Sequence, residues 1–200
     1  KSSGIQTLEG VFVTHSDEDH TNGILEILTA IREHRTSLRV KKLLLPYWMK
    51  TTGKKELAEA AEASGIPVIY LKKGGRIIDG EVCITVLHPQ PYEIPEDENS
   101  GSLTLRIDFK RFTAVFTGDL CGKAEEQVAE GDVSCQLLKV AHHGSVSSTG
   151  EEFLNAALPD ICFISCGADN RYGHPHPEVV KRIEHTGARI WQTSETGAVM

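Results

Sequence analysis

The stretch from Val11 to Gly23, which reads VFVTHSDEDHTNG, constrains this chain more than any other. Within six residues it supplies four side chains of the types that bind divalent metals: His15, Asp17, Asp19 and His20. No Lys or Arg lies among them, and carboxylates held together without a compensating cation are costly. The apolar run before His15 predicts a buried strand, so the sequence predicts a metal site at a strand end.

Alternation along an extended segment predicts how these side chains point. The first three of the four ligands would leave the strand on one side, whereas His20 can join them only if the backbone turns. Residues 21–23 are expected to make that turn, with Asn22 as the N-cap of a helix whose apolar positions begin at Ile24.

The composition sets limits on the class of protein. A length of 200 residues predicts one domain, residues 1–200, and 40% hydrophobic with 24% charged residues is ordinary for a soluble globular protein. No apolar run approaches membrane-spanning length and no signal-peptide pattern is present, so we expect the chain itself to be soluble. The formal charge of -7 argues against a broadly basic nucleic-acid-binding surface. It does not exclude a polyanionic substrate, because bound dications would add positive charge locally.

The spacing of apolar residues predicts a mixed α/β chain. Helices are expected at residues 24–33, 54–64, 123–129, 150–157 and 178–185. Strands are expected at residues 11–14, 40–45, 67–71, 77–78, 82–87, 103–109, 113–116, 137–141, 161–165 and 189–192. Asp79-Gly80 predicts a two-residue hairpin loop, and residues 93–101 are expected to form an acidic loop.

Three further polar clusters follow predicted strands. Asp119 comes after an apolar run and a glycine, His142 and His143 end the next strand, and His174 and His176 lie in YGHPHP. Ligands at several strand ends of one sheet would converge at a common edge, where mixed α/β folds build their sites. Each cluster alone is weak, but together with the first motif they predict a shared site.

These motifs carry a resemblance to a known family. THSDEDHTNG resembles the His-x-His-x-Asp-His signature of the metallo-β-lactamase superfamily, with Asp17 at the second histidine position, and FTGD resembles its bridging aspartate. The ordered set THSDEDH, NSGSLTLRI, FTGDL, LLKVAHHGSVSST and ISCGADNRYGHPHP is similar to the metallo-β-lactamase-like domain of the ComEC family of competence proteins, which work in DNA uptake.

The resemblance implies a four-layer αββα sandwich with two divalent metal ions, zinc or manganese, and no small organic cofactor. It further implies which side chains bind the metals. His15 and Asp17 would bind one metal ion, Asp19 and His20 the other, and Asp119 would bridge them. His143 would complete the second site.

The sequence departs from the family pattern in two places. Family members carry strands ahead of the first histidine motif, but only fourteen residues precede His15. We therefore expect a fragment of a larger protein that lacks N-terminal strands. The superfamily also often has a histidine where this chain reads ENSGS at residues 98–102, so Asn99 is either a substrate contact or a turn residue. The first site would then be rich in oxygen ligands, which loosens a preference for zinc in favour of manganese.

The resemblance also implies a function, a metal-dependent nuclease acting on single-stranded DNA during uptake. The full-length protein would lie in the cell membrane, with this domain on the extracytoplasmic side beside a channel domain. Asp19 is expected to orient the attacking water, and three histidines to donate a proton or bind phosphate: His142, His174 and His176. Asn99 and Ser145 are expected substrate contacts.

Two alternatives remain open at this point. The same centre could hydrolyse a small ester, thioester or phosphocholine ester, since one fold hosts many reactions. Alternatively, the chain could be a non-catalytic module that holds metal or DNA for a transport channel. A nucleophilic Ser145 is not expected, because Gly144-Ser145 lacks a Gly-x-Ser-x-Gly elbow.

Overall fold

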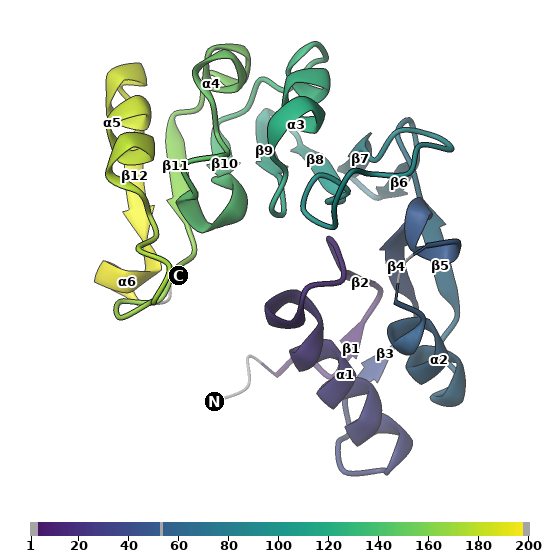
Figure 1. The fold of residues 1–200 in the computed structure, drawn as a ribbon. Helices are drawn as coiled ribbons and strands as arrows, with labels where there is room; N and C mark the ends of the chain where they lie inside the picture. Colours follow the sequence, from purple (N-terminus) through teal and green to yellow (C-terminus); the bar gives the residue numbers. More distant parts are fainter. Residues whose placement is uncertain (1–3, 53, 198–200) are drawn as a thin grey trace.

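The N-terminal third of the chain forms a small parallel sheet covered by two helices (Figure 1). The computed structural model describes residues 4–52 and 54–197. The sheet has the strand order β2-β4-β5, with β2 at Val11–Phe12, β4 at Leu43–Pro46 and β5 at Val68–Leu71. Parallel neighbours need long crossover connections, which here contain α1 (Glu18–Arg32) and α2 (Glu56–Ala63). The short strands β1 (Thr7–Leu8) and β3 (Arg39–Val40) pair separately.

The rest of the chain builds a seven-stranded sheet in the order β12-β11-β10-β9-β8-β7-β6. Its antiparallel part consists of β6 (Arg76–Asp79), β7 (Val82–His88), β8 (Thr104–Phe109) and β9 (Phe112–Phe116). Its parallel part continues from β9 through β10 (Leu137–Lys139), β11 (Ile161–Ile164) and β12 (Arg189–Gln192). The connections of the parallel part contain α3 (Gly122–Ala129), α4 (Glu151–Ala157) and α5 (Pro177–Thr186).

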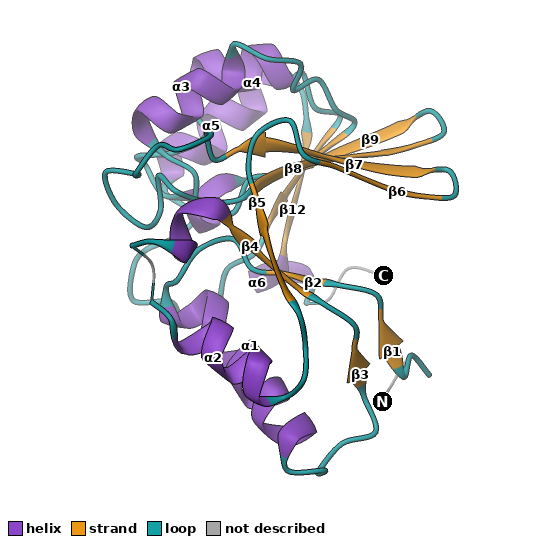
Figure 2. Ribbon diagram, turned by 90° about the vertical axis from the view of Figure 1, so that its right-hand side faces the viewer, coloured by secondary structure: helices purple, strands orange, loops and turns teal. Residues whose placement is uncertain are grey.

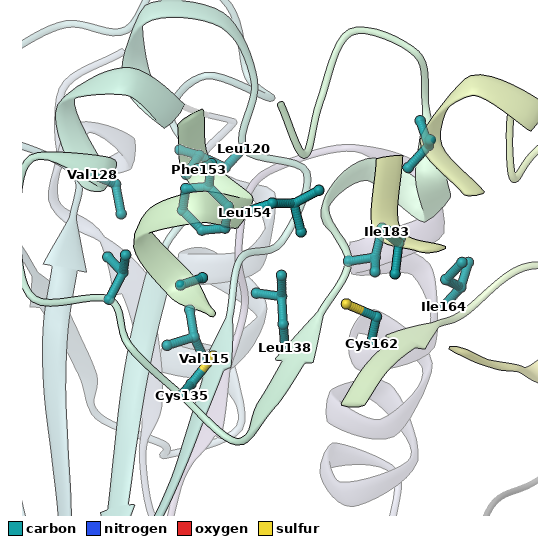
Figure 3. Packing of buried hydrophobic residues seen from close by; sticks show 14 of the residues in the cluster. Val115, Leu120, Val128, Cys135, Leu138, Phe153, Leu154, Cys162, Ile164 and Ile183 are labelled. Carbon is teal, nitrogen blue, oxygen red and sulfur yellow. The ribbon is translucent and has the colours of Figure 1, made fainter. Parts of the chain in front are cut away.

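Three separate apolar clusters show that the molecule has four layers. The largest cluster joins helices α3, α4 and α5 to one face of the large sheet, and Figure 3 shows Phe153 and Leu154 packed over Val115 and Leu138. A second cluster joins α1 and α2 to the small sheet. The third lies between the two sheets and contains Leu44, Leu71, Val86, Leu103 and Leu105. Figure 2 shows the resulting order of helices, sheet, sheet and helices, which confirms the predicted αββα sandwich.

Helix α1 differs from the sequence prediction at its start. It begins at Glu18 rather than Ile24, and Asp17 rather than Asn22 is its N-cap, so the predicted turn and cap at residues 21–23 are wrong. The acidic residues Glu18 and Asp19 lie in the first turn, where the partial positive charge of a helix N-terminus favours them. The first turn of the helix itself therefore carries His20 toward the ligands that precede it.

The other differences are shifts at the ends of elements. The strand predicted at residues 40–45 is divided between β3 and β4, and the end of the strand predicted at 137–141 is replaced by a 3₁₀ turn, η2 (Ala141–Gly144). Asp79 pairs with Val82, so the hairpin loop is one residue later than predicted. Three short elements were not predicted: β1, η1 (Tyr47–Lys50) and α6 (Thr193–Thr196). Within residues 4–52 and 54–197, no helix is both long and apolar enough to cross a bilayer.

We expect Ile183→Ala to destabilise the protein by about 2–5 kcal/mol, because it removes a fully buried side chain from the cluster beneath α5. Ile78→Ala provides a matched control, since Ile78 is 69% exposed, and should cost no more than about 0.5 kcal/mol. Denaturant unfolding of both variants measures the difference. Equal losses would show that α5 is not packed as described.

Candidate metal centre

Three segments meet at one edge of the sandwich to form a cluster of histidines and aspartates. One segment leads from β2 into α1, the second follows β9 at Gly118-Asp119, and the third is η2 after β10. Because β9 and β10 are parallel neighbours, their carboxyl ends lie at the same edge of the large sheet. The small sheet brings the β2 segment against them, and the amide of Leu103 donates to the carbonyl of Thr14 across this junction.

Asp119 lies at the centre of the cluster and is only 3% exposed. Its Oδ2 atom is 3.3 Å from His20 Nε2 and 3.5 Å from His143 Nε2. The same oxygen lies 3.9 Å from His142 Nε2 and 4.0 Å from His15 Nε2. Four imidazoles from two other segments therefore surround one carboxylate.

Asp17 and Asp19 supply the other two carboxylates of the cluster. Asp17 Oδ2 lies 3.5 Å from His15 Nε2, and Asp19 Oδ2 lies 3.4 Å from His143 Nε2 and 3.6 Å from His20 Nε2. Two groups of possible ligand atoms, each within 4.8 Å of one another, belong to His15, His20 and Asp119 and to Asp19, His20 and His143.

The histidine rings are held through their Nδ1 atoms. The Nδ1–H of His143 donates to the carbonyl of Ser165 at 2.6 Å. Thr14 Oγ1 lies 3.0 Å from His15 Nδ1 and 3.1 Å from His20 Nδ1. These contacts leave the Nε2 atoms of all three rings directed at the carboxylates, as partners outside a coordination sphere do in metal sites.

The donor set fits a divalent cation. Among the residues that the structure describes, buried His15 Nε2 and Asp119 Oδ1 have no hydrogen-bond partner. Unsatisfied buried polar atoms are rare and costly, and a cation accepting both lone pairs would remove the cost. Mixed imidazole and carboxylate ligands suit zinc and manganese alike.

The electrostatics of the cluster favour the protonation states that bind metals. Burial lowers the pKa of His15 to about 4, and the neighbouring charge of His20 adds to this effect. Burial alone would raise the pKa of Asp119, but the hydrogen bond and charge of His20, together with Lys139 and His143, hold it well below its usual range. At neutral pH His15 is therefore neutral and Asp119 ionised, which are the forms that bind a metal.

Lys139 is a member of this cluster that the sequence analysis missed. Its Nζ atom lies 3.9 Å from Asp119 Oδ1 and donates to the carbonyl of Gly118 at 3.3 Å. Burial lowers its pKa, while Asp119 and Asp19 act in the opposite direction. The sequence did contain a signal for this role, because Lys139 lies within the apolar strand LLKVA. A Lys is seldom buried without a partner of opposite charge.

The backbone of η2 is strained where it carries the two histidines. His142 and His143 have φ values of 48° and 54°, in the left-handed region that side chains other than glycine seldom adopt. Such residues cost of order 1 kcal/mol or more each and cluster at functional sites. Thr149 supports the turn, because its Oγ1 accepts from the amide of Ala141.

The cluster opens into a cleft with a volume of about 580 Å³. Asp17, Asp19 and Asn22 line one side, and His142 and His143 line the other. The segment between β11 and α5 adds the outer wall, which includes the predicted residue His174.

Five predicted site residues do not line this cleft. Two of them, His15 and His20, are buried or half-buried beside Asp119, and the other three lie elsewhere. His176 is the N-cap of α5, where its Nδ1 accepts from the amide of Glu178. The Ser145 hydroxyl is 3.1 Å from the hydroxyl of Ser147, so it is occupied locally. Asn99 lies in the loop before β8 with Oδ1 buried and, in the described part of the chain, without a hydrogen-bond partner.

The loop before β8 contributes Ser102, which sequence reasoning also missed. Its hydroxyl accepts from the amide of Asp119 at 3.0 Å and lies 3.4 Å from His15 Nδ1. His88, at the end of β7, holds the same loop because its Nε2–H donates to the carbonyl of Ser100 at 2.8 Å. Ser102 and His88 are thus supports for the cluster.

The four-layer sandwich, with histidines and aspartates gathered where its two sheets meet, defines the class of metallo-β-lactamase folds. The family model described as the metallo-beta-lactamase superfamily matches residues 1–167. The chain belongs to this superfamily, whose fold binds divalent metals, often two.

Curated relatives agree with the predicted resemblance to competence proteins. The chain is 32% identical to ComE operon protein 3 of Bacillus subtilis over 99% of its own length and 25% of that protein. It is 35% identical to Competence protein ComA of Neisseria gonorrhoeae over 52% of its length and 15% of that protein. The resemblance is confirmed, and the chain spans a quarter or less of these relatives.

Solved structures share the fold at low sequence identity. CmlA, a diiron beta-hydroxylase from Streptomyces venezuelae, matches with a TM-score of 0.63 at 15% identity, over 94% of this chain and 44% of CmlA. YhfI, a metallo-beta-lactamase fold protein from Bacillus subtilis, matches with a TM-score of 0.57 at 14% identity, over 92% of this chain and 74% of YhfI. These likenesses support the fold alone.

We expect Gly118→Ala to destabilise the protein by at least about 1 kcal/mol more than Gly187→Ala. Both glycines have positive φ values, 57° and 80°, but a Cβ at Gly118 would lie 2.8 Å from Thr14 Cβ, whereas the space at Gly187 is open. Thermal or denaturant unfolding measures the two losses. Equal losses would show that Gly118 is not packed closely against Thr14.

Acid should destabilise the protein partly through His88, which is 4% exposed. Burial lowers its pKa to about 4, although the bond to Ser100 raises it and Lys73 lowers it further. Between pH 6.5 and about 4 the unfolded chain therefore binds the proton more readily, so stability falls as pH falls, by up to about 3 kcal/mol.

The comparison of wild type with His88→Gln tests this expectation. Unfolding free energies measured from pH 7 to pH 4 with a chelator present should fall less steeply in the variant. His185→Gln, at an exposed histidine of α5, is the control. Parallel pH profiles for wild type and His88→Gln would contradict the assignment.

Proposed function

We propose that this chain is the hydrolytic domain of a longer protein and cleaves phosphodiester bonds of DNA with the help of two divalent metal ions. The convergence of three carboxylates and several imidazoles at the base of an open polar cleft carries the proposal. Membership of the metallo-β-lactamase superfamily and the similarity to Competence protein ComA support it. We further propose that residues 1–200 form a single domain.

The positions of the side chains support the following assignment of metal ligands. We assign His15 and Asp17 to one cation, because their side chains approach each other beside Asp119. Asp19, His20 and His143 are assigned to the other cation, since their ligand atoms form a second group. Asp119 is assigned to both, and zinc or manganese is compatible with this mixture of ligands.

Bound cations of this kind lower the pKa of water toward neutrality and neutralise charge on phosphoryl oxygens. The protein's own residues then position the substrate and move protons. Asp19 lines the cleft and can accept a hydrogen bond from the attacking water. His142 and His174, on the facing wall, can hydrogen-bond a phosphate oxygen or protonate the leaving oxygen.

The shape and polarity of the cleft favour a polymer over a small ester. A pocket for a small apolar ester would bury most of its ligand between hydrophobic side chains. Most of the residues that line this cleft are instead of charged or polar types, and they include Tyr172 with its exposed side chain. An extended anionic chain can cross such a surface.

The larger setting is part of the proposal. The chain corresponds to a quarter of ComE operon protein 3. We propose that the longer protein adds a membrane channel, that this domain lies on its extracytoplasmic side, and that the substrate is single-stranded DNA produced during uptake.

We expect the purified protein to bind manganese or zinc and to cleave a fluorescent single-stranded oligonucleotide. Asp119→Ala should lower the rate at least about 100-fold and reduce the bound metal, because it removes the buried carboxylate whose Oδ2 lies within 4.0 Å of the Nε2 atoms of His15, His20 and His143. Asp79→Ala, at an exposed aspartate of the β6–β7 hairpin, is the matched control and should retain both properties. Metal content is measured by elemental analysis and cleavage by gel electrophoresis.

Each other outcome would contradict the nuclease in a distinct way. Cleavage that survives Asp119→Ala would belong to a contaminant. Tight metal and DNA binding without cleavage under either metal would indicate a non-catalytic module. Hydrolysis of a phosphocholine or thioester substrate, with DNA left intact, would indicate a small-ester hydrolase.

A further inference from the structure

A short loop forms the outer wall of the cleft and carries none of the assigned metal ligands. This loop, residues 167–174, lies between β11 and α5 and is named here the cleft loop. Four residues of the cleft loop line the same cleft as Asp119: Gly167, Asn170, Arg171 and Tyr172. His174, at its end, lines the cleft as well.

Asn170 holds the cleft loop in one shape. Its Nδ2 donates to the carbonyls of Gly167 at 2.8 Å and His174 at 2.6 Å. Its Oδ1 accepts from the amide of His174 at 2.8 Å. With three hydrogen bonds closing the loop, its backbone is ordered in advance, which lowers the ordering cost of binding.

Together with His142 of η2, the side chains of His174, Tyr172 and Arg171 form a row of ring contacts, called here the stack, that runs outward from the metal centre. His142, whose Nε2 lies 3.9 Å from Asp119 Oδ2, meets the ring of His174 edge to face, with 5.8 Å between ring centroids and planes inclined by 64°. The Tyr172 ring is stacked on His174, with centroids 5.9 Å apart and planes inclined by 18°. The guanidinium of Arg171 lies over the Tyr172 ring at 5.1 Å. The stack thus begins at the central carboxylate and ends in solvent.

The outer end of this stack has the chemistry of a nucleotide contact. Tyr172 is 68% exposed although its ring is flat and largely apolar. Exposed aromatic rings and guanidinium planes beside a phosphate-binding centre are surfaces on which bases of single strands stack, with little preference for sequence. Arg171 also supplies positive charge to a cleft that is otherwise rich in carboxylates.

We propose that the cleft loop binds the base of a nucleotide next to the phosphate held at the metal centre, with Tyr172 and Arg171 as the stacking surface. The inference rests on the proposed function and deepens it by giving a physical reason for single-strand preference. Inside a duplex, neighbouring base pairs already cover both faces of each base, so no internal base is free to stack on Tyr172. Tyr172 would contact the flat face of the base and not its hydrogen-bonding edge, so all four bases should bind.

Binding to two synthetic strands tests the proposal. Fluorescence anisotropy, with manganese present and phosphorothioate linkages in both strands to slow cleavage, compares an octamer of thymidines with an octamer of abasic sites. The wild type should bind the thymidine strand about 5- to 100-fold more tightly. Tyr172→Ala should remove most of this difference by weakening thymidine binding alone, and Tyr172→Trp should restore it. Tyr92→Ala, at a tyrosine that is 76% exposed and outside the cleft lining, is the control.

The outcomes separate this inference from the proposed nuclease. Equal binding of the two strands by the wild type, or an unchanged difference in Tyr172→Ala, would overturn the stacking contact. The metal-dependent cleavage assay would still test the proposed nuclease activity independently. Conversely, a difference that depends on Tyr172 without cleavage under manganese or zinc would uphold the contact and overturn the nuclease.

Discussion

The structure depends on one buried carboxylate. Asp119 is almost fully enclosed, and its Oδ2 atom lies within 4.0 Å of imidazole nitrogens from two other segments of the chain. Removing an ion from water costs several kcal/mol unless partners replace the lost hydration. Here the replacement consists of imidazoles and the ammonium group of Lys139. The hydroxyl of Ser102 holds the backbone of the same residue, because it accepts from the Asp119 amide. The two sheets must meet correctly for all of these to be present.

The packing of the four layers explains how the side chains around Asp119 are held together. The apolar cluster between the sheets packs β4 and β5, with Phe12 of β2, against β7 and β8, and the helices on either side pack against the outer faces of the sheets. The cluster of ligands can then include strained backbone at His142 and His143, because packing elsewhere supplies the compensating free energy. Stability and the geometry of the centre are thus coupled through the same contacts between sheets.

Part of the negative charge of the molecule is concentrated in the cleft. A formal charge of -7 would repel a polyanion, and part of that charge lies in the cleft itself as Asp17, Asp19 and Asp119. Cations bound by these carboxylates would reverse the local sign, so metal binding and polyanion binding are expected to be linked. The exposed ring of Tyr172 adds an attraction that does not depend on charge.

The sequence alone determined the mixed α/β architecture, most of the strands and the residue types of the centre. Periodicity and composition report local structure, and ligands spaced within six residues are close whatever the fold. It misplaced the start of α1, because the helix N-terminus is set by Asp17 and an acidic first turn as well as by apolar spacing. Only the tertiary structure brought Lys139 and Ser102 to Asp119 and placed Tyr172 at the cleft. Contacts between residues distant in the chain depend on how the sheets pack, and no local pattern encodes that packing.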